Sequence, residues 1–183
     1  ERQTGYGIIY NDANIEAMGA KDPLDLYLSN EWTWDTFKDL LIQWQDFKED
    51  AIGITSGSGA PIHFAATTGA VPIQYTGDDV KNNLRDANIM RAMQFLQDLY
   101  KEGLVYEDYM GPDNSEGWTS GNVLFFNFGC EWAVQCGQET LFRNDKEGTV
   151  KFVPMPRDPQ ADKYYQLATT CGYLIPAGAT NVQ

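Results

Sequence analysis

The chain has 183 residues, which is long enough for one domain to bury a substantial hydrophobic core without disulfides or metal. Its 26 acidic residues against 13 basic ones give a formal net charge of −13. This charge argues against nucleic acid and anionic membrane surfaces as partners, because both attract a basic surface. The cysteines, at 130, 136 and 171, fit neither a disulfide framework nor a metal-ligand spacing, and whether Cys130 and Cys136 pair is open.

Signals for membrane insertion and export are not visible in the sequence. No apolar run approaches the roughly 20 residues that would span a bilayer, and the start is not the basic-then-apolar pattern of a signal peptide. The chain opens on Glu1 without an initiating Met. We therefore expect it to be part of a longer protein, whose location these absences do not indicate.

Strand-like and helical patterns alternate along the chain. In order, the expected elements are a strand at 7–10, a helix at 13–18 closed by Gly19, an irregular segment at 21–31, a helix at about 34–47, a strand at 51–55, a loop at 56–61, a helix at 64–68, a short strand or loop at 71–75, a turn at 77–79, a helix at about 88–102, an apolar strand at 123–126, a helix at 135–143, a strand at 150–153 and a strand at 164–175. This alternation is typical of α/β layer structures. We predict an α/β fold with a mixed sheet flanked by helices.

The helix expected at 34–47 has one apolar face. Thr33 is suited to be its N-cap residue. The apolar positions recur at helical spacing and are Phe37, Leu40, Leu41, Trp44 and Phe47. Trp34 and Trp44 are therefore expected to pack in or beside the core rather than to contact a ligand.

The segment 114–132 is the most informative about function. A turn at Gly121 leads into the apolar run 123–126, and a bend that begins with glycine then presents Trp132. A strand that ends in a loop carrying an indole is a common way to offer a flat apolar platform to a ligand. No catalytic motif accompanies this segment, so the pattern indicates binding rather than chemistry.

Candidate catalytic groups are few. The only histidine, His63, follows a Gly/Pro loop with no carboxylate or nucleophile near it in sequence, which argues against a hydrolytic triad and a zinc site. Glycoside hydrolysis needs two carboxylates, and Glu131 beside Trp132 is the leading candidate acid. Glu131 can equally accept a hydrogen bond from a sugar hydroxyl or be a solvent-facing charge, and these alternatives stay open. We predict a protein that is not an enzyme, with no catalytic residue, metal or cofactor.

Five short motifs occur in a familiar order. They are Tyr6-Gly-Ile-Ile-Tyr-Asn11, Thr33-Trp-Asp-Thr-Phe37, Trp118-Thr-Ser-Gly-Asn-Val123, Gly129-Cys-Glu-Trp132 and Gly172-Tyr-Leu-Ile-Pro-Ala-Gly-Ala-Thr-Asn181. In this order the chain resembles the second lobe of the family 1 extracellular solute-binding proteins. These are the sugar-binding components of ABC importers and include maltose-binding protein. The resemblance implies that residues 1–183 form a single α/β lobe of a periplasmic-binding-protein-like (type II) fold, with the first lobe and a C-terminal segment absent.

The sequence departs from the family pattern at two positions. One additional residue stands between Gly129 and Trp132, and Asn122 replaces a usual lysine. The first departure bears on where the indole lies, whereas the second concerns the surface.

The resemblance also implies a function and a set of ligand contacts. It indicates a protein that binds a sugar or oligosaccharide in a cleft between two lobes and delivers it to an ABC transporter permease. The implied location is extracellular, as a cell-surface lipoprotein, or periplasmic, with membrane contact only through an anchor. The implied ligand-binding residues are Trp132, Glu131, His63, Thr170 and Gly172, and glycine allows close approach of the backbone. The alternatives are a glycosidase that uses Glu131, and an interaction or sensor module.

Overall fold

The computed structural model describes residues 2–56, 59–106, 120–129, 149–171 and 177. In chain order its elements are β1 (Arg2–Asn11), α1 (Asp12–Met18), α2 (Pro23–Leu28), α3 (Trp34–Phe47), β2 (Ile52–Ser56), α4 (Ala60–Thr67), β3 (Ile73–Thr76), β4 (Asp79–Asn82), α5 (Ala87–Lys101), β5 (Val105–Tyr106), β6 (Val123–Gly129), β7 (Val150–Pro154) and β8 (Ala168–Cys171). The helix predicted at 135–143 lies outside the described residues.

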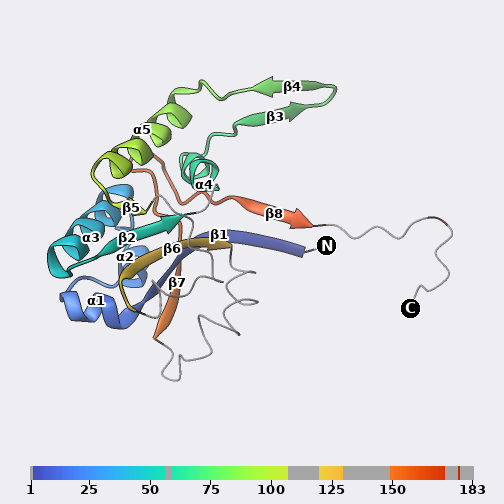
Figure 1. Ribbon diagram of the computed structural model, residues 1–183. Helices are drawn as coiled ribbons and strands as arrows, with labels where there is room; N and C mark the ends of the chain where they lie inside the picture. Colours follow the sequence, from blue (N-terminus) through green and yellow to red (C-terminus); the bar gives the residue numbers. More distant parts are fainter. Residues whose placement is uncertain (1, 57–58, 107–119, 130–148, 172–176, 178–183) are drawn as a thin grey trace.

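The main sheet is mixed. Its strand order is β5-β2-β6-β1-β7, with β8 paired to β1 (Figure 1). Strand β2 runs parallel to β5 and β6, whereas β1 runs antiparallel to β6, β7 and β8. The first residues of β1 pair with β8, and its last residues pair with β6 and β7. The predicted α/β fold with a mixed sheet flanked by helices is confirmed.

Local sequence signals explain where α1 and α3 begin and end. Helix α1 starts after Asn11, whose side chain accepts a hydrogen bond from the backbone of Ala13, and ends at Gly19 in the left-handed conformation, φ 66°. Helix α3 starts at the predicted N-cap residue Thr33, which forms a reciprocal capping box with Thr36. Both predicted helices are confirmed.

Two segments were predicted as irregular and are helical. Residues 23–28 form α2, because Asp22 caps the backbone N–H of Leu24 and Pro23 occupies the first turn, where a missing N–H has no cost. The helix expected from residue 64 begins at Ala60, so His63 lies within α4 and not in a loop. In both cases a proline that looks like a breaker is a helix start.

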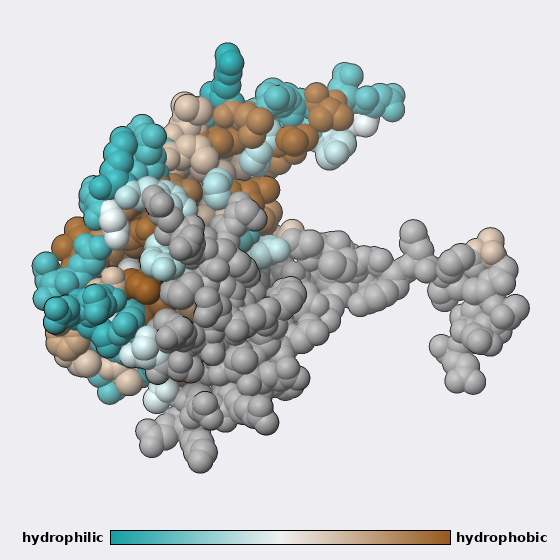
Figure 2. Space-filling model, in the orientation of Figure 1, coloured by the Kyte–Doolittle hydropathy of each residue, from teal (hydrophilic) through white to brown (hydrophobic). Residues whose placement is uncertain are grey.

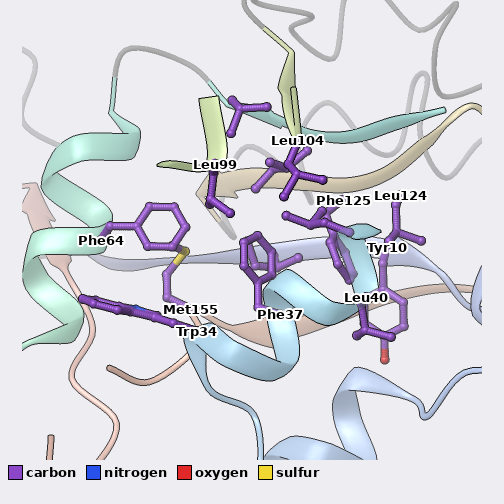
Figure 3. Packing of buried hydrophobic residues seen from close by; sticks show 14 of the residues in the cluster. Tyr10, Trp34, Phe37, Leu40, Phe64, Leu99, Leu104, Leu124, Phe125 and Met155 are labelled. Carbon is purple, nitrogen blue, oxygen red and sulfur yellow. The ribbon is translucent and has the colours of Figure 1, made fainter. Parts of the chain in front are cut away.

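Buried residues of α1 to α5 and of the sheet form one large hydrophobic cluster (Figure 3). Phe37 lies at its centre, with ring centroids 5.7 Å from Trp32, 6.0 Å from Phe64 and 5.5 Å from Phe125. Aromatic pairs at these distances stabilise a core beyond the area that they bury. Trp34 and Trp44 belong to the same cluster, as predicted. Phe47, predicted on the buried face of α3, is 53% exposed.

A hairpin of β3 and β4 joins α4 to α5 and extends away from the main sheet (Figure 1). Ile73, Tyr75 and Val80 share one face, because Tyr75 pairs with Val80 and strand side chains alternate. All three are exposed, and apolar residues mark the hairpin in Figure 2. The sequence predicted the turn at 77–79 but not β4, whose composition is mostly polar.

The last predicted strand, at 164–175, begins later in the structure, at residue 168. Strand β8 covers residues 168–171. The segment before it is held by contacts of Tyr164. Tyr164 packs edge-on against Tyr27 at 4.8 Å, and Arg157 lies 5.7 Å from the Tyr164 ring. The last residues of the predicted strand, 172–175, lie outside the described residues.

Candidate ligand-binding site

The candidate site lies where the parallel strands β2 and β6 end. Ser56, the last residue of β2, pairs in parallel register with Asn127 of β6. Strand β1 runs in the opposite direction, so an early residue, Tyr6, pairs with Gly129 at the end of β6. Ligands of open α/β sheets bind beside the carboxyl ends of parallel strands. This edge of the sheet is therefore the natural place for a ligand.

His63 is packed at this edge between α4, β1 and β6. It is 7% exposed, and its ring stacks on that of Tyr6 with centroids 4.0 Å apart. Its Nδ1 lies 2.7 Å from Oδ1 of Asn127, while Nδ2 of Asn127 donates to the Met155 sulfur at 3.4 Å. Because a carbonyl oxygen only accepts hydrogen bonds, Nδ1 carries the proton that it donates to Asn127.

A glycine makes room for the other edge of the His63 ring. A Cβ atom at Gly59 would lie 2.9 Å from Cε1 and 3.1 Å from Nε2 of His63. The Gly59 carbonyl also accepts the His63 backbone N–H at 3.1 Å, in the first turn of α4. The absence of a side chain at residue 59 is thus what lets the imidazole lie against the start of its own helix.

The surroundings of His63 favour its neutral form. Burial lowers the pKa of His63, because an imidazolium loses its hydration inside the protein, and the bond to Asn127 raises it by less. The pKa of His63 therefore lies below its ordinary value. A neutral imidazole with a proton on Nδ1 has a lone pair on Nε2.

Of the predicted site residues, only His63 and Thr170 fall within the described residues. Thr170 lies in β8 and pairs with Gln3 of β1. The backbone N–H of Tyr6 donates to the carbonyl of Leu167, just ahead of β8, at 3.4 Å. The start of β8 therefore meets β1 close to Tyr6, which stacks on His63. Thr170 lies further along β8, opposite Gln3 and away from Tyr6.

Glu131, Trp132 and Gly172 lie outside the described residues. Glu131 and Trp132 follow shortly after Gly129, the last residue of β6, and Gly172 directly follows β8. Their predicted contacts with a ligand stay predictions.

Sequence reasoning missed Tyr6 and Asn127. Asn127 interrupts the apolar run of β6, and it is 5% exposed. A buried amide requires hydrogen-bond partners, so an asparagine directly after the predicted strand at 123–126 and before another phenylalanine was a usable signal. Tyr6 had no such signal, because half-buried tyrosines are common at strand ends.

Two depressions lie away from this edge. A groove of about 710 Å³ is lined by residues of α2, α3 and the segments beside them, including the carboxylates Glu31, Asp35 and Asp39. A second, of about 260 Å³, is lined by Trp34, Phe95 and the ion pair of Arg91 with Asp158, among others. Neither is lined by a predicted site residue.

No described helix combines the length and apolar character needed to cross a membrane. Within the same residues, no group of three His, Cys, Asp or Glu side chains is arranged to hold a metal ion.

Compared by sequence, the chain matches no protein-family model and no curated protein. Compared by structure, it is similar to the GacH receptor of Streptomyces glaucescens, solved unliganded and with acarbose, at a TM-score of 0.70 and 15% identity over 91% of this chain and 40% of that one. It is also similar to an ABC-transporter-associated binding protein from B. animalis subsp. lactis, in complex with β-1,6-galactobiose (TM-score 0.69, 17% identity, 91% of this chain and 41% of that one). A third is the Thermus thermophilus maltotriose binding protein (TM-score 0.60, 19% identity, 91% and 42%).

At these identities the similarity shows the fold. The chain has the periplasmic-binding-protein-like α/β fold found in sugar-binding ABC solute-binding proteins. It spans about two fifths of the length of those structures, an extent consistent with one lobe.

Proposed function

We propose that the chain is one lobe of the solute-binding component of an ABC importer and that it binds a sugar or oligosaccharide in a cleft between two lobes. The observation that carries this proposal is the similarity of fold, over 91% of the chain, to proteins solved with such ligands. The protein is a binding protein and not an enzyme in this proposal. It acts outside the cell or in the periplasm and delivers its ligand to a permease.

The ligand contacts come from the carboxyl edge of the sheet. A sugar has apolar C–H faces and a rim of hydroxyls, so it binds by stacking on an aromatic ring with polar groups around it. In this proposal Trp132 supplies the stacking surface, and Glu131 and His63 supply polar contacts. Thr170 and Gly172 are the positions at which, in this proposal, the backbone approaches the ligand.

The two strands β1 and β8 are suited to lead toward a second lobe. Residues 2–5 of β1 pair with residues 168–171, beyond the part of β1 that pairs with β6 and β7 (Figure 1). A ligand that touches both lobes favours the closed arrangement by its higher affinity for it. Closure of this kind presents the loaded protein to the transporter.

A titration of the 183-residue protein tests the proposal. Maltotriose, laminaribiose and β-1,6-galactobiose are added while amide shifts are followed by NMR. We expect weak binding, with Kd on the order of 1 mM, because half of the contacts are absent. Trp132→Ala should abolish this binding, while Trp132→Phe retains a stacking ring and serves as the matched control. Tight binding would contradict the proposal that this lobe supplies only part of the ligand contacts. Absence of binding by all three sugars would contradict the proposed ligand class.

A further inference from the structure

A groove on the face of α1, α2 and α3 lies apart from the candidate ligand site. These helices lie on the opposite side of the protein from the start of β1 and the end of β8 (Figure 1). The groove has a volume of about 710 Å³ and is lined by the residues that follow α1, by α2, and by α3 with the segment before it. A volume in this range accommodates a ligand of drug size, which corresponds to a few amino-acid side chains.

The floor of the groove is formed by its apolar side chains, Ala20, Leu26 and Leu40. Leu26 and Leu40 also belong to the hydrophobic core, whereas Ala20 is half-buried. Thr36 lines the groove as well, but its hydroxyl already donates to the backbone carbonyl of Glu31 at 2.8 Å. An occupant therefore gains from covering the floor with an apolar group, and its polar contacts have to come from other lining residues.

The rim of the groove carries an excess of negative charge. It consists of the carboxylates of Glu31, Asp35 and Asp39, against one lysine, Lys21, in the lining. Lys21 lies 3.3 Å from Glu31. Asp35 and Asp39 are exposed and have no ion pair among the described contacts, and their spacing of four residues in α3 makes them neighbours on one face of the helix. These two carboxylates therefore meet an occupant without a described cation of their own.

We propose that this groove docks a short segment of a partner protein in which an arginine stands beside an apolar side chain. The apolar side chain covers the floor at Leu26 and Leu40, and the guanidinium lies against Asp35 and Asp39. Arginine suits this position better than lysine, because its planar fork of donors can bond two carboxylate oxygens at once. This surface is separate from the proposed sugar site and does not depend on it.

Charge complementarity identifies the occupant. An acidic segment would be repelled by Asp35 and Asp39, and an uncharged one would displace water from them with weaker bonds in exchange. A second copy of this chain is disfavoured, because 26 acidic against 13 basic residues make two copies repel each other. A small inorganic cation would leave the apolar floor uncovered. A protein segment that is both basic and apolar meets both requirements.

A peptide titration of the 183-residue protein tests the proposal. The probe is a short peptide, capped at both ends, that alternates leucine and arginine, and amide shifts are followed by NMR. We expect a Kd on the order of 0.1–1 mM at about 0.05 M salt, with the largest shifts at the residues that line the groove. Two peptides serve as controls. Glutamate in place of arginine should abolish binding, and serine in place of leucine should weaken it about tenfold.

Substitutions locate the binding in the groove. Asp35→Asn with Asp39→Asn should weaken binding of the leucine–arginine peptide about tenfold, because it removes both carboxylates without changing side-chain size. Asp46→Asn with Glu49→Gln is the matched control, because both residues are exposed, neither lines the groove, and the pair removes the same amount of charge. It should weaken binding by less than about twofold, through the lower net charge alone.

Each alternative outcome would overturn the proposal. These outcomes are absence of binding by the leucine–arginine peptide, shifts that lie outside the groove, equal binding of the serine or glutamate peptide, and equal weakening by the two double substitutions. The peptide controls need no substitution, so they decide the question even if a variant fails to fold. None of these outcomes affects the proposed sugar binding, which the titration with sugars tests separately.

Discussion

Asp22 joins the start of α2 to the sheet, and its removal should be costly. The carboxylate accepts hydrogen bonds from the backbone N–H of Leu24 at 2.8 Å, from the Tyr10 hydroxyl and from Nζ of Lys151 at 2.7 Å. Asp22→Ala removes a helix cap, worth about 1 kcal/mol. It also leaves the hydroxyl of the buried Tyr10 without its partner, at about 1–2 kcal/mol. Lys151 retains Asp12 at 2.7 Å, so loss of that ion pair adds less than about 1 kcal/mol.

The expected loss of unfolding free energy for Asp22→Ala is therefore about 3 kcal/mol, measured by urea denaturation of the 183-residue protein. Asp25→Ala is the matched control, because Asp25 is an exposed first-turn acid of the same helix and should cost less than about 1 kcal/mol. Tyr10→Phe in the Asp22→Ala background should recover part of the loss by removing the unpaired hydroxyl. An Asp22→Ala cost no larger than that of Asp25→Ala would refute the reasoning.

The effect of Asp22 should also depend on pH. Burial raises the pKa of Asp22, but the bonds from Lys151 and Tyr10 outweigh it and hold the pKa below its ordinary value. A lowered pKa stabilises the folded state above the ordinary aspartate value of about 3.9, and this stabilisation is lost as the pH falls through the folded value. The difference between wild type and Asp22→Ala should therefore shrink below about pH 4.

Three further predictions address other parts of the structure. Gly59→Ala should destabilise by about 1–3 kcal/mol, because its Cβ would press on His63, whereas Gly5→Ala has open space and should change thermal stability little. Arg91→Met should lower the free energy of unfolding, measured by urea denaturation, by about 3 kcal/mol. The reason is that the carboxylate of Asp158, 1% exposed, stays buried without its cation. A loss under about 1 kcal/mol would contradict this. The pKa of His63 is lower in the folded state than in the unfolded state, so the unfolded state takes up the proton at a higher pH. Folding stability should therefore fall as the pH drops below about 6.5, and acid-dependent denaturation of His63→Gln should lack this step.

Elements with strong local signals were predictable from the sequence. The capping residue Thr33, the apolar stripe of α3 and Gly19 after α1 specify these helices through neighbours a few positions away. Helices α2 and α4 were missed at their starts, because Pro23 and Pro61 suit a first turn as well as they suit a loop.

The candidate site was predictable only in part. His63 was identified as a candidate ligand contact, but its partners were not. Asn127 is 64 positions away in the chain, and Tyr6 is on a strand that precedes both. Their meeting depends on the order of strands in the sheet, which local patterns do not contain.

By itself, the sequence determined the alternation of helices and strands, the buried faces and the excess of negative charge, because each depends on residue type at short spacing. Only the tertiary structure decided that β2 and β6 run parallel and end side by side, with the antiparallel β1 bringing Tyr6 to the same edge. That arrangement buries the imidazole of His63 and bonds its Nδ1 to the distant amide of Asn127. The physical reason is that hydrogen bonding and burial act between neighbours in space, whichever part of the chain supplies them.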